Sequence, residues 1–191
     1  MRDRLGGVEG NEILTSAVAV VLTALLLAVG VTVVRMRGLV GVHLFLGLAL
    51  IPPVALKLAS TGYRFARYYT HGPAYRAKGP PPAPLRMLAP VLVLATLGVF
   101  VTGVVLLADG HKAGAMLELH KISFIVWGVV FGVHFLAHLP RVVRSLRRDW
   151  TPGGRREVPG AGLRATLVAL SLGAGAGLAL ALAHTVDAWR P

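Results

Sequence analysis

Three histidines lie in a stretch of the sequence that is otherwise strongly apolar. The segment ELHKISFIVWGVVFGVHFLAHLPR, residues 118–141, carries His120 near one end and His134 and His138 near the other. Placing an ionisable side chain in hydrocarbon costs free energy, so such residues inside membrane segments usually serve a function. An imidazole can ligate a metal, exchange protons near neutral pH or donate hydrogen bonds. These three residues are therefore the first candidates for chemistry in this chain.

A fourth histidine, His43, lies in a second apolar stretch, GLVGVHLFLGLALIPP. A helix advances about 1.5 Å and 100° per residue, so the fourteen residues from His120 to His134 cover about 21 Å with little net rotation. His120 and His134 therefore lie on one side of a helix, near opposite membrane surfaces. His43 is six residues past Arg37, which predicts a shallow depth similar to that of His120 on a helix of the same direction. Two imidazoles at one level on two helices are arranged as axial ligands of a haem iron.

The surroundings of these two histidines bear on the haem hypothesis. The helix of His43 carries Gly41 and Gly47, and the helix of His120 carries Gly128, where a flat macrocycle would meet little side-chain bulk. A single membrane histidine is often only hydrogen-bonded to a nearby carbonyl, and His120 could simply lie at the membrane interface. The match in depth and direction favours haem for the pair.

The elements that must position these histidines follow from hydropathy. Five segments are apolar and long enough to cross a bilayer, which takes about 20 helical residues; they are residues 13–34, 38–60, 87–108, 117–140 and 165–184. The chain of 191 residues is 55% hydrophobic and 15% charged, against about 25% charged in soluble domains. No loop is long enough to bury a core of its own. We therefore expect an all-α integral membrane protein of one domain, a four-helix haem-binding bundle with a fifth transmembrane helix.

Cysteine is absent from the sequence. Its absence excludes disulfides, thiolate metal sites, cysteine nucleophiles and covalent haem attachment through CxxCH, so a haem would be held non-covalently. The sequence also lacks a glycine-rich phosphate loop and the HExxH and GxSxG motifs. We assign no catalytic residues.

The basic residues are distributed unevenly between the two sides of the membrane. Fourteen Lys and Arg lie in the N-terminal tail and in loops 61–86 and 141–164, and five lie on the opposite side. Because basic residues collect in cytoplasmic loops, we expect the N-terminus in the cytoplasm of a bacterial cell, the C-terminus outside, and the chain in the inner membrane. This distribution explains the net charge of +12 without a nucleic-acid partner. Loop 61–86 also holds all four tyrosines, which suits anchoring in lipid headgroups, with docking of a cytoplasmic partner as the alternative.

Two helices have features that affect packing. Pro52 and Pro53 remove backbone donors from the second helix and predict that its regular part kinks or ends there. In the fifth helix, Gly173, Gly175 and Gly177 alternate with alanines and allow close approach of another helix. That neighbour is either in the same bundle or in a second subunit of a homo- or hetero-oligomer.

A second polar group is expected at the cytoplasmic end, formed by His134, His138, Lys57 and Arg141. One hypothesis is a quinone or proton-uptake site, in which the imidazoles exchange protons and the cations contact quinone or a haem propionate. Another is a metal site built on the i, i+4 pair of histidines, which would need a further ligand such as Glu12. The simplest alternative is a hydrogen-bonded histidine pair with cations that reach the headgroups.

The spacing of these histidines resembles that of the bacterial cytochrome b561 superfamily, which includes membrane subunits of respiratory formate dehydrogenases and hydrogenases. One histidine near the outer end of the second helix and two on the fourth, fourteen residues apart, match the family pattern over about residues 13–140. The resemblance implies a four-helix bundle with two b-type haems that passes electrons between a periplasmic or membrane-bound enzyme and quinone. It assigns His43 and His120 to the outer haem and His134 to the inner one.

The sequence departs from the family pattern at the inner haem. The start of the first helix, GNEILTSAV, offers no histidine to pair with His134. Protonated Lys57 is a poor iron ligand, and a boundary methionine such as Met87 is more often ordinary packing. We therefore expect one haem, with a second as the alternative. The expected function is electron transfer between a periplasmic redox partner at the outer face and the quinone pool; the alternative is a non-redox membrane protein, either a small transporter or an assembly or scaffold subunit.

Overall fold

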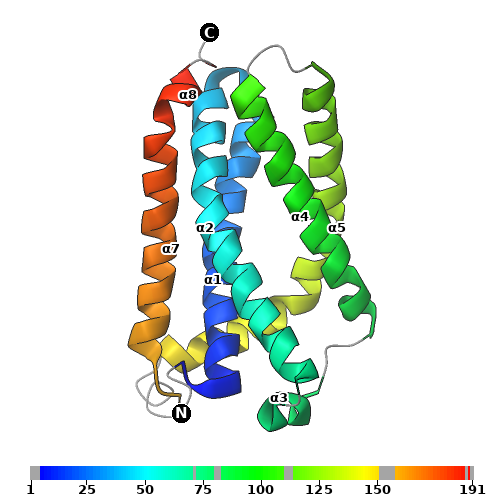
Figure 1. Cartoon of the computed structure of the whole chain (residues 1–191), viewed down its shortest axis with the longest axis vertical. Coiled ribbons are helices and arrows are strands. Elements are labelled where there is room, and N and C mark those ends of the chain that lie inside the picture. Colours follow the sequence, from blue (N-terminus) through cyan, green and yellow to red (C-terminus); the bar gives the residue numbers. More distant parts are fainter. Residues whose placement is uncertain are drawn as a thin grey trace.

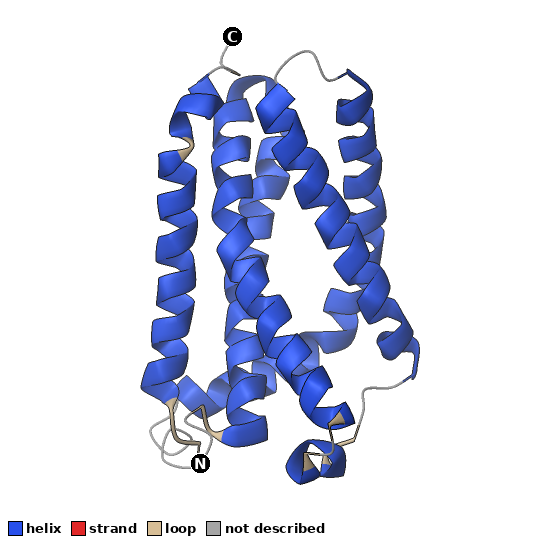
Figure 2. Ribbon diagram, in the orientation of Figure 1, coloured by secondary structure: helices blue, strands red, loops and turns tan. Residues whose placement is uncertain are grey.

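The fold is a bundle of long helices, seen in a computed structural model that describes residues 5–70, 72–79, 83–109, 114–187 without 151–157, and 189. For residues 141–143, 145–150, 186 and 187 only the backbone is described. The described part of the chain is helical and contains no strand (Figure 1, Figure 2). Its elements are α1 (Gly7–Val34), α2 (Met36–Tyr69), α3 (Pro73–Ala77), α4 (Ala83–Asp109), α5 (Gly114–Trp150), α7 (Ala161–Ala181) and α8 (Ala183–Asp187).

Five of these helices, α1, α2, α4, α5 and α7, are long and apolar enough to cross a membrane, which confirms the expected all-α membrane fold. Most are longer than predicted. The expected loops 61–86 and 141–164 are partly helical, because α2 continues to Tyr69 and α5 continues to Trp150. Hydropathy marks only the part of a helix inside the lipid. No proline follows in the polar part of α2 until Pro73, and α5 continues through Pro140, which lies at the predicted end of the fourth apolar segment.

The helices pack as two antiparallel pairs with one additional helix. Only Arg35 separates α1 from α2, so these two form a tight antiparallel hairpin. The second pair is α4 and α5, and α5 also packs against α1. Helix α7 packs on α2 and α1, outside the second pair (Figure 1). This arrangement is a four-helix bundle with a fifth helix on one side.

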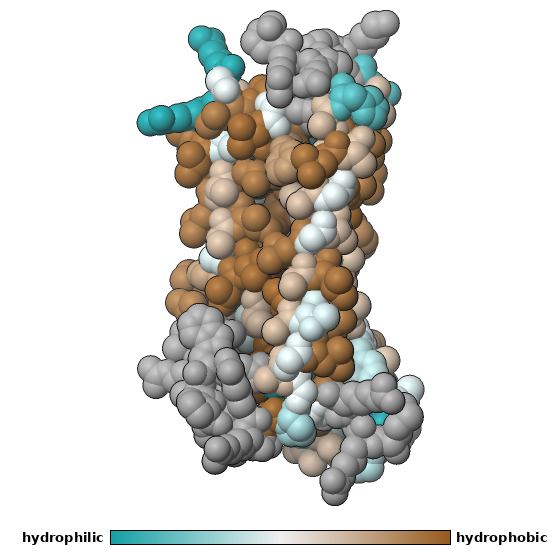
Figure 3. Space-filling model, turned by 90° about the vertical axis from the view of Figure 1, so that its left-hand side faces the viewer, coloured by the Kyte–Doolittle hydropathy of each residue, from teal (hydrophilic) through white to brown (hydrophobic). Residues whose placement is uncertain are grey.

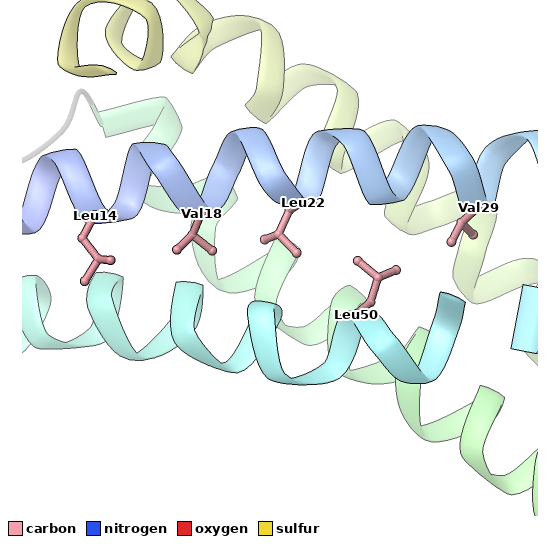
Figure 4. Close-up of a cluster of buried hydrophobic side chains, with 5 residues drawn as sticks. All are labelled: Leu14, Val18, Leu22, Val29 and Leu50. Atoms are coloured by element: carbon pink, nitrogen blue, oxygen red, sulfur yellow. The ribbon is translucent and has the colours of Figure 1, made fainter. Parts of the chain in front are cut away.

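The core lies mainly between α1 and α2. Four buried side chains of α1 point toward α2, and Leu50 of α2 points back toward them (Figure 4). The α1 residues are Leu14, Val18, Leu22 and Val29. Their spacing of four, four and seven residues keeps them on one helix face. In lipid this contact is held by close van der Waals packing, because hydrocarbon tails are as apolar as the side chains.

Most of the apolar surface of the helices is not covered by protein. At most 22% of the most apolar window of each spanning helix is buried, and none of it is buried in α5. In Figure 3 apolar side chains cover the middle of the visible face, and hydrophilic side chains gather toward its ends. An exposed apolar band of this extent belongs in lipid, so the chain is a multi-pass membrane protein.

The second helix does not end at its prolines, one of the two outcomes that the sequence left open. Pro52 and Pro53 lie inside α2, which continues for sixteen residues beyond them, and its one non-helical residue is Leu39 near the start. The missing donors are tolerated because α1 and α7 enclose this part of α2. One of these contacts is very close: a Cβ at Gly175 of α7 would lie 2.2 Å from the carbonyl oxygen of Ala49. Gly175 therefore packs α7 against α2 of the same chain. Of the two neighbours that the sequence allowed for the glycine repeat, this is the one within the bundle.

The two ends of the chain lie at opposite ends of the bundle, as an odd number of spanning helices requires. The N-terminus and α3 lie at one end of the bundle, and the C-terminus lies at the other (Figure 1). Arg164, only 1% exposed, donates to the carbonyl oxygens of Leu5 at 2.7 Å, Pro159 at 2.8 Å and Val158 at 3.2 Å. This guanidinium joins the start of α7 to the segment that leads into α1.

Candidate functional site

His43 and His120 lie near the same end of the bundle. His43 is seven residues after the start of α2, and His120 is six residues after the start of α5. At about 1.5 Å per residue, they lie about 10 Å and 9 Å from their helix starts. Both helices begin at the end of the molecule that also carries the C-terminus (Figure 1). The two imidazoles are therefore at similar depths on helices of the same direction.

Each of these histidines is bound by a threonine of the preceding helix in its own pair. The Nδ1 of His43 lies 2.8 Å from Oγ1 of Thr32 on α1. The Nδ1 of His120 likewise lies 2.8 Å from Oγ1 of Thr102 on α4. Both threonines are buried. The two helix pairs thus present one histidine each through the same kind of contact.

The threonine hydroxyls favour one tautomer of both rings. Oγ1 of Thr32 lies within donor distance of the carbonyl oxygen of Val29, at 2.6 Å, and Oγ1 of Thr102 lies 2.7 Å from that of Gly98. A hydroxyl has one proton, so a threonine that keeps its carbonyl bond accepts from its histidine. In that arrangement Nδ1 carries the ring proton in His43 and in His120, and Nε2 carries the lone pair.

Both rings make their threonine contact through Nδ1. The His120 ring also hydrogen-bonds the backbone of Val99 on α4. The two rings are also close enough to interact electrostatically with each other. Gly103 of α4 lies against His120, since a Cβ there would be 3.2 Å from Cε1 of the imidazole. At Gly47 and Gly128, where we expected little side-chain bulk beside a macrocycle, a Cβ would meet nothing within 4 Å.

This chemistry fits a haem with two axial histidines. A metal-bound histidine almost always donates its other ring N–H to an oxygen, which orients the ring and strengthens the ligand. In the tautomer that the threonines favour, His43 and His120 both have that donor engaged and an unprotonated Nε2. These two residues would hold the iron of a haem, as the sequence predicts.

The histidines at the other end of α5 have different surroundings. The rings of His134 and His138 stack at 4.2 Å with an interplanar angle of 18°. Nδ1 of His138 donates to the carbonyl oxygen of His134 at 2.9 Å. Nδ1 of His134 is buried and has no hydrogen-bond partner among the described residues. The two rings share a face, as their i, i+4 spacing predicts.

Lys57 reaches the same region from α2. Its Nζ donates to the carbonyl oxygen of Thr15 at 2.7 Å, and it interacts electrostatically with His134. Thr15 and Asn11 of α1 are in turn bonded to Ser60, at 3.0 Å to its hydroxyl and 3.1 Å to its carbonyl oxygen. A connected polar network therefore runs between α1 and α2 at the level of the two stacked histidines.

The other candidates at this end are not brought to the histidines. The side chain of Met87 is 71% exposed, so it does not complete a pair with His134. Glu12 forms an ion pair with Lys78. The described residues contain no group of three or more metal-binding side chains, so the third ligand that a metal site would need is missing there. The side chain of Arg141 lies outside the described residues. Among the described residues, His43 and His120 are therefore the one matched pair of candidate ligands, and His134 has no such partner.

A row of stacked aromatic rings lies in the middle of α5. Trp127 stacks on Phe131 at 4.7 Å, and Phe124 and Phe135 extend the row at 6.0 Å and 5.7 Å. Nε1 of Trp127 donates to Oγ1 of Thr96 on α4 at 3.0 Å. The row begins after His120 and reaches the level of His134, so polarisable apolar surface separates the two histidine levels.

The sequence interpretation missed Thr32, Thr102 and Gly103. Threonines in membrane helices usually bond to a carbonyl of their own helix, as Thr23 and Thr96 do. The neighbouring sequence does not distinguish Thr32 and Thr102 from Thr23 and Thr96. The only available signal is their place near the end of a helix that is followed by a histidine-bearing helix.

Comparison with known proteins adds no relative. No protein-family model matches the chain, and neither the curated proteins nor the solved structures contain a significant match. The function must therefore be argued from the geometry of the site.

Proposed function

We propose that this chain is a b-type haem electron-transfer protein of the membrane, similar to the cytochrome b561 superfamily. One observation carries the proposal. His43 and His120, at similar depths on two helices, each place Nδ1 2.8 Å from the hydroxyl of a buried threonine, a contact that favours Nε2 as the ligand atom. A hydrogen bond between neighbouring helices is enough for helix association, which does not require two histidines matched in this way.

The chain's own residues would orient the ligands and keep water from the site. A bound haem would supply a one-electron iron couple. Thr32 and Thr102 hold the rings, and Gly103 leaves space for the ring of His120. The apolar walls of α2 and α5 give a low dielectric, which raises the influence of each nearby dipole on the iron.

We further propose that the chain exchanges electrons between a periplasmic redox partner and the quinone pool. The excess of basic residues near the N-terminal face supports placing that face in the cytoplasm of a bacterial inner membrane. The haem-site end then faces the periplasm. Lys57, His134 and His138 at the cytoplasmic end supply donors and exchangeable protons suited to a quinone.

A visible spectrum of the purified protein tests the haem proposal. We expect a Soret band and a sharp α-band on reduction with dithionite. His43→Ala and His120→Ala should each abolish these bands, whereas His134→Ala should retain most of the haem. His184→Ala is the matched control, because His184 is exposed on α8. A wild-type protein without a Soret band after expression with added haem precursor would refute the proposal.

The alternative is a non-redox membrane protein, a small transporter or a scaffold. It is favoured by the fact that each Thr–His bond joins the two helices of one pair, which would also serve helix association. In that case the histidine variants would lower the thermal stability of a protein that never binds haem.

A further inference from the structure

Two buried threonines have the same relation to two histidines that lie far apart in the sequence. Thr32 precedes His43 by eleven residues, and Thr102 precedes His120 by eighteen. In both cases the threonine lies on the first helix of an antiparallel pair and the histidine lies on the second. In both cases the distance from Oγ1 to Nδ1 is 2.8 Å. The separation in sequence differs between the two pairs, yet the hydroxyl contacts the same ring nitrogen at the same distance. This agreement indicates that both histidines need the same contact.

We propose that Thr32 and Thr102 are positioning residues that select the iron-binding tautomer of His43 and His120. This inference rests on the proposed haem function. It adds that the two hydroxyls, rather than the haem itself, fix which ring nitrogen is presented. The haem-free protein is then already arranged for ligation.

The argument depends on how many protons and lone pairs each hydroxyl has. The single proton of each hydroxyl is used by a carbonyl of its own helix, Val29 for Thr32 and Gly98 for Thr102. While that bond is kept, the remaining lone pairs accept from an N–H. The opposite tautomer would require the hydroxyl to leave its carbonyl in order to donate to Nδ1, which costs one hydrogen bond. Each threonine therefore disfavours one tautomer and one ring flip.

A valine at either position removes the acceptor while retaining a similar shape. The ring would then be free to exchange tautomers, and the fraction of protein ready to bind iron would fall. Loss of such an outer hydrogen bond typically costs about 10–100-fold in metal affinity. The ligand also becomes less basic, so the midpoint potential of the haem should rise. A purely structural threonine would change stability without changing the tautomer or the potential.

The first experiment uses the haem-free full chain with ¹⁵N-labelled histidine in lipid nanodiscs. In the wild type we expect His43 and His120 to show protonated Nδ1 and unprotonated Nε2. Thr32→Val and Thr102→Val should each give a tautomer mixture at the one histidine concerned. Thr32→Ser and Thr102→Ser should restore the wild-type signals. Thr96→Val is the matched control, since Thr96 bonds Trp127 instead of a histidine.

The second experiment titrates haem into the same variants. The valine variants should bind haem about 10–100-fold more weakly than the wild type, with a raised midpoint potential, and the serine variants should recover both. Wild-type tautomers, affinity and potential in both valine variants would overturn this inference while leaving the haem proposal intact. A wild type that binds no haem would overturn the proposed function and this role with it, even if the tautomers were as expected.

Discussion

Gly103 on α4 lies directly against His120 on α5, where a Cβ would be 3.2 Å from Cε1 of the ring. Its neighbour Thr102 lies 2.8 Å from Nδ1, the ring atom next to Cε1. A hydroxyl and a bare backbone therefore contact the same edge of the ring. This contact uses the smallest residue to bring a helix close to a candidate iron ligand.

Substitution of Gly103 should impair haem binding in proportion to side-chain size. Gly103→Ala requires a shift of a few tenths of an ångström and should weaken haem binding modestly, whereas Gly103→Val should displace His120 and abolish most of it. Haem content per protein, measured by pyridine haemochrome, checks the series. Gly128→Ala is the control, because a Cβ there meets nothing within 4 Å. Equal haem content in the alanine and valine variants at position 103 would contradict the predicted contact.

The glycines of α7 should differ sharply in their tolerance of a methyl group. A Cβ at Gly175 would lie 2.2 Å from the carbonyl oxygen of Ala49, a backbone atom that cannot move independently of α2. We expect Gly175→Ala to lower the free energy of unfolding by about 1–3 kcal/mol, the usual cost of overpacking. Thermal unfolding in detergent micelles measures the effect.

Gly173→Ala and Gly177→Ala are the matched controls, since neither Cβ would meet anything within 4 Å. Both should be neutral or stabilising by up to about 1 kcal/mol through helix propensity. Equal destabilisation at all three positions would show that α7 does not pack through Gly175.

Lys57 should matter for reaction with quinol and much less for the haem itself. Lys57→Met removes a cation that donates to the carbonyl oxygen of Thr15 and interacts with His134, at the end of the bundle away from His43 and His120. We expect an unchanged haem spectrum and an unchanged rate of reduction by dithionite. The rate of haem reduction by a ubiquinol or menaquinol analogue should fall on the order of 10²-fold, the lower end of what a positioned proton-transferring group contributes.

Lys78→Met is the control for Lys57, because Lys78 pairs with Glu12 at the surface. It should leave both rates unchanged. A quinol-driven rate that stays at the wild-type value in Lys57→Met would remove Lys57 from the quinone proposal.

Arg164 should be the most important charged residue for the stability of the N-terminal region. Its guanidinium is only 1% exposed and donates to the carbonyl oxygens of Leu5, Pro159 and Val158. Arg164→Ala should lower the free energy of unfolding by at least about 1.5–3 kcal/mol, the contribution of a hydrogen bond that involves a charged group. Arg164→Lys should recover little of it, since an ammonium cannot reproduce the planar fork.

Thermal unfolding and limited proteolysis near residue 5 check the role of Arg164. The control is Arg144→Ala, because Arg144 is exposed and donates to the carbonyl oxygen of Pro140 at 3.2 Å. Wild-type stability in Arg164→Ala would show that the three carbonyls find other donors at no cost.

Some parts of the candidate site were predictable and others were not. His43 and His120 were identifiable because imidazoles stand out in apolar segments and the rise of a helix is constant. The exposure of Met87 was not, because a residue at a helix end can face the bundle or the lipid equally well. Whether α2 would end at Pro52 and Pro53 was not predictable either, since neighbouring helices decide whether a proline ends a helix in a membrane.

The sequence by itself determined the number of membrane helices, their order and the depth of each histidine. These properties depend on length, hydropathy and the fixed geometry of one helix at a time. The tertiary structure alone decided that Thr32 meets His43, that Thr102 and Gly103 meet His120, and that Gly175 meets Ala49. The physical reason is that a membrane helix is apolar on nearly every side, so hydropathy does not specify its rotation. Close packing and hydrogen bonds between distant segments set that rotation.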